Sequence, residues 1–110
     1  MKRLLAPVAA VLLALTLPAQ AETILILHDT HDLPPPYFQQ WFATPTEGPG
    51  LLPGAQEVFI RGDGKHGDFF GVLQLNCDTP ERSYWVHEGG FLTGNHVPAE
   101  AIRNLRKALC

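Results

Sequence analysis

The sequence has few of the side chains from which nucleophilic active sites are built. Ser83 is its only serine, and its two cysteines are more simply assigned to a disulfide than to catalysis. No pair of carboxylates and no nucleophile beside a base stand out along the chain. We therefore expect no catalytic residues and a protein that is not an enzyme.

Positive charge is also scarce. Eight Lys and Arg residues stand against eleven Asp and Glu residues, which gives a formal net charge of −3. Two of the basic residues, Lys2 and Arg3, lie in a predicted leader, so the remainder of the chain is more acidic still. This balance argues against nucleic acid or an anionic membrane surface as the main partner.

One long apolar run is present, at the beginning of the chain. Residues 4–17 follow a basic N-terminus and precede small residues that suit cleavage after Ala21. The pattern predicts a secretory signal peptide over residues 1–21 and one small domain over residues 22–110. A retained membrane anchor is the alternative, but prolines interrupt the run, which is short for crossing a bilayer. We expect a periplasmic or secreted protein without a stable membrane anchor.

A single pair of cysteines in an exported chain indicates one disulfide, Cys77–Cys110. The alternatives are two free thiols or a bridge between two chains through the C-terminal cysteine. Closing a loop of about 34 residues stabilises a fold by roughly 3–4 kcal/mol in chain-entropy treatments. That is a large share of the total stability expected for so small a domain.

Three segments have the composition of β-strands. Thr23–Leu27 is a short apolar run that predicts a strand buried on both faces. Val58–Cys77 predicts two strands around a turn rich in Gly and Asp, and Ser83–Glu88 predicts a further strand. In the second strand of the hairpin, alternate residues from Phe69 to Cys77 form an inward apolar face. Gln74 and Asn76 are expected on the other face, in contact with water.

Two segments are predicted to be helical. Pro98–Leu109 has an apolar stripe of Ile102, Leu105 and Leu109, with Pro98 suited to the first position. Tyr37–Phe42 gathers four aromatic side chains on one side of a short helix.

These elements predict an α+β fold with a small antiparallel sheet of three or four strands, a packed C-terminal helix and one disulfide. The segment Thr44–Gln56 is expected to be an irregular connection.

Aromatic residues supply the candidate binding residues, which are Tyr37, Trp41 and Trp85. Packing in the core is the first interpretation of the aromatic cluster at residues 37–42, because clustered aromatics usually fill an interior. A ligand-binding aromatic platform is the alternative, since many grooves are lined by aromatic side chains.

A loose cluster of imidazoles and carboxylates supplies the candidate metal ligands, which are His28, His31, His66 and Asp68. Such ligands suit zinc, copper or nickel, and a tight turn at residues 28–32 could bring the first two together. The alternative is a strand end at which polar side chains bond to nearby backbone. We expect no cofactor, with a divalent metal as the open possibility.

Residues Gly71–Cys77, Tyr84 and His96–Cys110 resemble the C-terminal half of surface-adhesin-E-like proteins, which are small exported bacterial proteins. The shared features are a strand that ends in cysteine, a Val/Ile-Pro entry to a helix, and a closing cysteine. The likeness covers under half of the predicted domain. It implies an antiparallel sheet with a packed helix and a binding role at the cell envelope.

We therefore expect a small exported, non-catalytic interaction protein that binds a protein or an envelope component. It would use exposed parts of residues 34–37 and 44–56. The alternative is a periplasmic metal-binding protein that uses the His/Asp cluster. A small secreted hydrolase or inhibitor is a third hypothesis.

Overall fold

The computed structural model describes residues 22–46 and 50–110, so the predicted signal peptide at residues 1–21 lies outside the described residues. The described part contains five strands, one α-helix and two short 3-10 helices. The strands are β1 (Ile24–Asp29), β2 (Gln39–Pro45), β3 (Ala55–Gly64), β4 (Phe69–Asn76) and β5 (Tyr84–Gly90). The helices are η1 (Pro80–Arg82), η2 (Gly94–His96) and the C-terminal α2 (Ala99–Leu109). None of the helices described here is long and apolar enough to cross a membrane.

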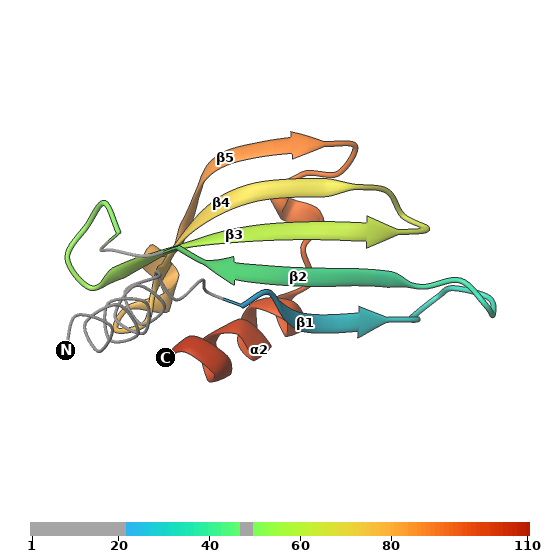
Figure 1. The fold of residues 1–110 in the computed structure, drawn as a ribbon, viewed down its shortest axis with the longest axis horizontal. Helices are drawn as coiled ribbons and strands as arrows, with labels where there is room; N and C mark the ends of the chain where they lie inside the picture. The colour runs from blue at the N-terminus through green and yellow to red at the C-terminus, as the bar shows by residue number, and fades with distance from the viewer. Residues whose placement is uncertain (1–21, 47–49) are drawn as a thin grey trace, which may run out of the picture.

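The strands form one antiparallel sheet in the order β1-β2-β3-β4-β5, so each strand pairs with its neighbour in sequence (Figure 1). The structure has an antiparallel sheet, one C-terminal α-helix and one disulfide, but the prediction of three or four strands is wrong, because the sheet has five. Part of the difference is the segment Tyr37–Phe42, which was expected to be a helix and instead leads into β2. Its side chains at Gln39, Trp41 and Ala43 are buried, and those between them are half-buried. Burial that alternates from one residue to the next is typical of a strand. A short aromatic cluster is compatible with the period of a helix and with that of a strand, so pairing with neighbouring strands decides between them.

Strand β1 corrects a second expectation. It lies at the edge of the sheet and pairs only with β2, whereas a strand buried on both faces was predicted. Ile26 is its one buried residue, and Leu25 is 49% exposed. Composition alone does not separate an apolar edge strand from a central one, because both are short apolar runs.

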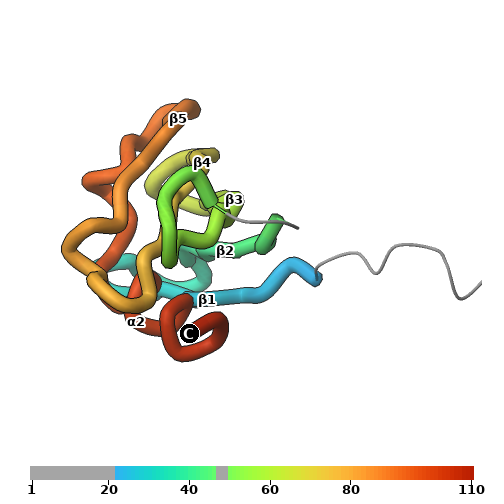
Figure 2. The backbone as a smooth tube through the Cα atoms, turned by 90° about the vertical axis from the view of Figure 1, so that its left-hand side faces the viewer, coloured from blue at the N-terminus to red at the C-terminus, as the bar shows by residue number. Residues whose placement is uncertain are grey.

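Helix α2 lies beside β1 on one side of the sheet (Figure 2). The side of the helix that was predicted to face the sheet is the buried one, since Ala101 and Leu105 are fully buried. A polar contact fixes the helix to the sheet, because Asn104 Nδ2 donates to the carbonyl oxygen of Ile26 at 2.7 Å. The core between helix and sheet consists of Ile26, Trp41, Ala43, Val58, Ile60, Phe69, Leu73, Leu75, Leu92, Ala101 and Leu105.

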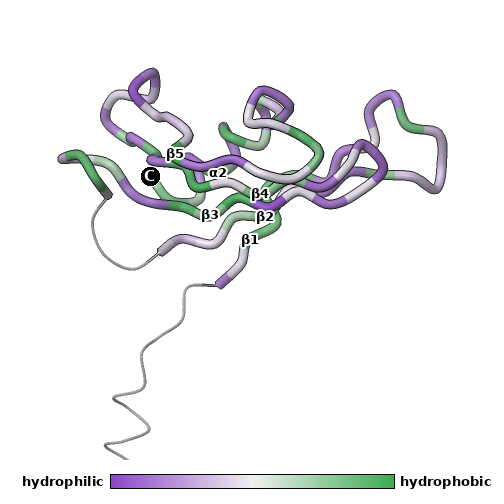
Figure 3. The backbone as a smooth tube through the Cα atoms, turned by 90° about the horizontal axis from the view of Figure 1, so that it is seen from above, coloured by the Kyte–Doolittle hydropathy of each residue, from purple (hydrophilic) through white to green (hydrophobic). Residues whose placement is uncertain are grey.

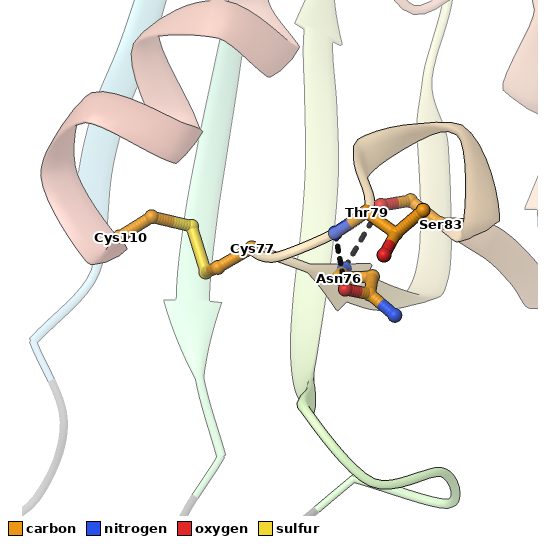
Figure 4. The surroundings of a disulfide bond; sticks show 5 residues. All are labelled: Asn76, Cys77, Thr79, Ser83 and Cys110. Carbon is orange, nitrogen blue, oxygen red and sulfur yellow. Dashed lines mark hydrogen bonds between the residues drawn. A yellow bond between two sulfur atoms is a disulfide. The ribbon is translucent and has the colours of Figure 1, made fainter.

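Gln74 and Asn76 are buried, although they were expected to contact water. Gln74 accepts the backbone N–H of Leu51 at 2.8 Å through Oε1, and its Nε2 donates to Glu57 at 3.2 Å. Asn76 Oδ1 accepts the backbone N–H of Thr79 at 2.8 Å (Figure 4). Connecting segments therefore cover this end of the sheet and satisfy its polar groups.

The disulfide Cys77–Cys110 is present, with a Cα–Cα distance of 5.5 Å. It joins the residue after β4 to the residue after α2, so the last turn of the helix is held at the end of the sheet (Figure 4). A disulfide is typical of a non-cytoplasmic, oxidising location.

Replacing both cysteines tests the contribution of this bridge. We expect Cys77→Ala/Cys110→Ala to lower the free energy of unfolding by about 3–4 kcal/mol, because the unfolded chain loses a closed loop. Urea denaturation followed by circular dichroism measures the change. The wild type unfolded in reductant is the control, since it loses the bridge and keeps both sulfur atoms. Equal midpoints for the oxidised wild type and the double variant would show that the bridge adds nothing.

Candidate functional site

The sheet has one covered face and one open face, because successive side chains of a strand point to opposite sides. In β3, Val58 and Ile60 point to the covered face and are buried. Phe59 lies between these two residues and Arg61 follows Ile60. Both therefore point to the opposite face, and both are exposed. The covered face is the one against which α2 packs. The described residues place no helix over the other face.

Apolar side chains gather on this uncovered side, which we name the open face. Four of them are substantially exposed, at 49% for Leu25, 49% for Phe59, 60% for Phe70 and 40% for Tyr84. Contiguous exposed apolar side chains mark interaction surfaces more often than isolated ones do. The open face comprises Leu25, Phe42, Phe59, Arg61, Phe70, Val72 and Tyr84.

Strand register makes these side chains neighbours. Leu25 pairs with Phe42 across β1 and β2, Phe42 pairs with Arg61, and Arg61 pairs with Phe70. Residues directly opposite in an antiparallel pair have Cβ atoms about 4.5–5.5 Å apart. One row of contacting side chains therefore crosses four strands.

The single cation in this row is held in place. The Arg61 guanidinium lies 4.4 Å from the centroid of the Phe42 ring and pairs with the carboxylate of Asp63. A guanidinium stacked on a ring presents little unsatisfied charge. Arg61 thus extends the aromatic surface and also offers N–H donors at its edge.

Phe70 lies over a glycine of the neighbouring strand. It pairs with Gly89 of β5, and a Cβ added at Gly89 would lie 2.1 Å from Cζ of the Phe70 ring. The ring therefore lies across the backbone of the glycine, where no side chain of β5 separates it from the sheet.

A second apolar segment borders the open face. Leu51 is 66% exposed and Leu52 is 47% exposed, and Leu51 donates its backbone N–H to Gln74 of β4. Figure 3 shows an apolar segment at the edge of the molecule, near the start of β3. The predicted irregular connection is thus shorter than expected, because β2 ends at Pro45 and β3 begins at Ala55.

The structure does not bring the three predicted binding residues onto one surface. Tyr37 is 46% exposed, with Lys65 Nζ 4.5 Å from its ring centroid. Trp41 is 1% exposed and belongs to the core, 5.9 Å from the ring of Phe69. Trp85 is half-buried and meets Phe69 edge to face at 5.2 Å. Sequence reasoning missed Phe59 and Phe70. The signal for them is the run of consecutive apolar residues in β3 and in β4, because neighbouring residues of a strand point to opposite faces.

Three of the four predicted metal ligands have hydrogen-bond or ion-pair partners of their own. His28 Nδ1 bonds to Gln40 Nε2 at 2.9 Å, and His31 pairs with exposed Asp32 at 3.2 Å. Asp68 Oδ1 accepts the backbone N–H of Phe91 at 3.0 Å. Among residues 22–46 and 50–110, no group of three or more His, Cys, Asp or Glu side chains could hold a metal ion. The geometry therefore gives no support to metal binding.

His66, the fourth predicted ligand, lines a cavity of about 290 Å³ together with Asp29, Trp41, Leu92, His96 and Pro98. A separate cavity of about 300 Å³ is lined by His28 and by the proline-rich segment that follows β1. The two predicted ligands His28 and His66 thus lie in different cavities.

Adjacent phenylalanines provide a matched test of the two faces. Phe69 is 1% exposed and Phe70 is 60% exposed. We expect Phe69→Ala to lower the free energy of unfolding by about 3–5 kcal/mol, because it leaves a cavity in the core. Phe70→Ala should change it by only about 0.5 kcal/mol. Urea denaturation of both variants measures the difference, and equal losses would mean that the open face is part of a core.

Comparisons with known proteins yield no relative from which a function could be transferred. No family model, no curated protein and no solved structure matches the chain. The resemblance of the C-terminal half to surface-adhesin-E-like proteins stays a prediction. The function is therefore argued from the geometry of the sheet.

Proposed function

We propose that this chain is a small, non-catalytic interaction protein whose open face binds a partner protein that presents apolar side chains. The observation that carries the proposal is the pair of exposed rings, Phe59 and Phe70, on adjacent strands of a sheet face that no described helix covers. Folding gains nothing from leaving such rings in water, so their placement is explained by a partner that covers them.

The composition of the open face favours a protein partner over other classes. Aromatic side chains and arginine are the residues that carry most binding energy at protein interfaces. Arg61 of this face is already paired with Asp63, so its guanidinium offers little free positive charge to a polyanion. The acidic net charge of the chain points the same way.

We further propose that the protein acts in the periplasm or outside the cell, as one domain spanning residues 22–110. Two observations support this location. The chain begins with the basic, apolar and small-residue order of a signal peptide. The disulfide Cys77–Cys110 fits an oxidising compartment.

Site-directed photo-crosslinking tests the open face. His87 is exposed and pairs with Val72, so a crosslinking side chain at this position reaches a partner without removing a central ring. In extract from the source cells, we expect one discrete adduct from this position. A crosslinker at Lys107, which is exposed on α2, is the control and should not give that adduct.

The crosslinked protein is then identified by mass spectrometry, purified and titrated against this chain. We expect Phe59→Ser/Phe70→Ser to weaken binding at least 30-fold, the effect of losing about 2 kcal/mol at a central contact. Lys107→Ser should bind as the wild type does. Equal affinity of the double variant would contradict the proposal. An adduct with a second copy of this chain, with a dimer in sedimentation, would replace the partner protein with self-association.

A further inference from the structure

Half of the basic residues in the described part of the chain gather on one element, away from the open face. Of the eight Lys and Arg residues, Lys2 and Arg3 lie outside the described residues, which leaves six. Three of these six, Arg103, Arg106 and Lys107, lie in the last two turns of α2. The protein as a whole has a formal net charge of −3. The end of α2 is therefore a local concentration of positive charge on an acidic protein.

The three basic side chains line one cleft. It has a volume of about 320 Å³, and Cys110 lines it with them. Arg106 and Lys107 follow Arg103 by three and four positions, so the three side chains are neighbours on the helix surface. The disulfide to Cys77 ties the end of α2 to the end of β4, so the wall at Cys110 is held in place (Figure 4).

Within the described part of the chain, no acidic side chain pairs with these cations. The two ion pairs that the structure shows there lie elsewhere. Arg106 is half-buried, and its Nε is enclosed without a hydrogen-bond partner, so this side chain lies along the protein rather than extending into water. A partly buried charge without a counter-charge is costly, and an anion in the cleft would offset that cost.

Two features at the end of α2 reduce the positive charge without cancelling it. The negative end of the helix dipole is equivalent to about half a charge, and a carboxylate at Cys110 adds at most one. Three cations therefore keep the cleft positive. Cations in the last turn are expected, because they complement the dipole. Arg103 lies a turn earlier, so the dipole does not account for its place in the set.

We infer that this cleft binds a phosphate group. A phosphate monoester carries about −1.5 to −2 charges near pH 7, which is close to the charge that the cleft has to offset. Its oxygens accept hydrogen bonds from guanidinium groups in pairs, and a lysine ammonium adds a point charge. A carboxylate has one charge and two oxygens, so it would satisfy fewer of the three cations. A free small molecule and a lipid head group can both present this phosphate.

Calorimetric titration with inorganic phosphate at constant ionic strength tests the cleft in the oxidised protein. We expect a saturable heat that corresponds to one site. Acetate is the control anion and should bind at least fivefold more weakly, because it has a single charge. Equal binding of acetate and phosphate shows an adventitious ion only and overturns the inference.

Sedimentation with vesicles distinguishes the two sources of the phosphate. Vesicles of phosphatidylcholine that contain phosphatidic acid present a phosphate monoester, and vesicles of phosphatidylcholine alone do not. Sedimentation only with phosphatidic acid assigns the cleft to a lipid head group. Binding of inorganic phosphate without sedimentation assigns it to a free small molecule, and both results together show that it accepts either. Binding to neither overturns the inference.

Exposed residues provide a matched pair of variants. Arg103→Gln/Lys107→Gln removes two cations from the cleft, and Lys65→Gln/Arg82→Gln removes two from elsewhere; all four side chains are exposed. We expect the first variant to weaken phosphate or vesicle binding about tenfold and the second to change it less than about twofold. The two variants have the same net charge, so the comparison separates the cleft from general attraction. Equal weakening in both overturns the assignment to the cleft.

Discussion

The packing of α2 against the covered face is the contact on which the architecture depends. Ala101 and Leu105 lose all their exposed surface there, and Asn104 bonds to the backbone of β1. The disulfide holds the other end of the same helix at the end of β4. In the described residues this helix is the only one of more than a single short turn, so it covers one face of the sheet and leaves the other to solvent or to a partner.

Glycines opposite aromatic residues shape both faces of this sheet. On the covered face, Trp41 pairs with Gly62, and the ring lies over the glycine. On the open face, Phe70 pairs with Gly89 in the same way. A side chain at either glycine would displace the ring, because the space that a Cβ needs is already filled. The same arrangement, a ring that lies over a glycine, therefore occurs at Trp41 in the core and at Phe70 on the exposed face.

The chemistry of the open face fits its proposed role. The face is largely apolar, and its row of paired side chains crosses four strands, which suits a broad contact with another protein. Such a contact needs neither a nucleophile nor a metal ion.

The sequence by itself determined the elements that depend on local pattern. Turn residues between two apolar runs located the β3–β4 hairpin, periodicity and a leading proline located α2, and cysteine count located the disulfide. Tertiary structure decided the remainder. The aromatic segment at residues 37–42 fits a helix or a strand, and only pairing with β1 and β3 selects the strand. The burial of Gln74, the exposure of Phe70 and the separation of His28 from His66 depend on which segments lie over each face, which local pattern does not encode.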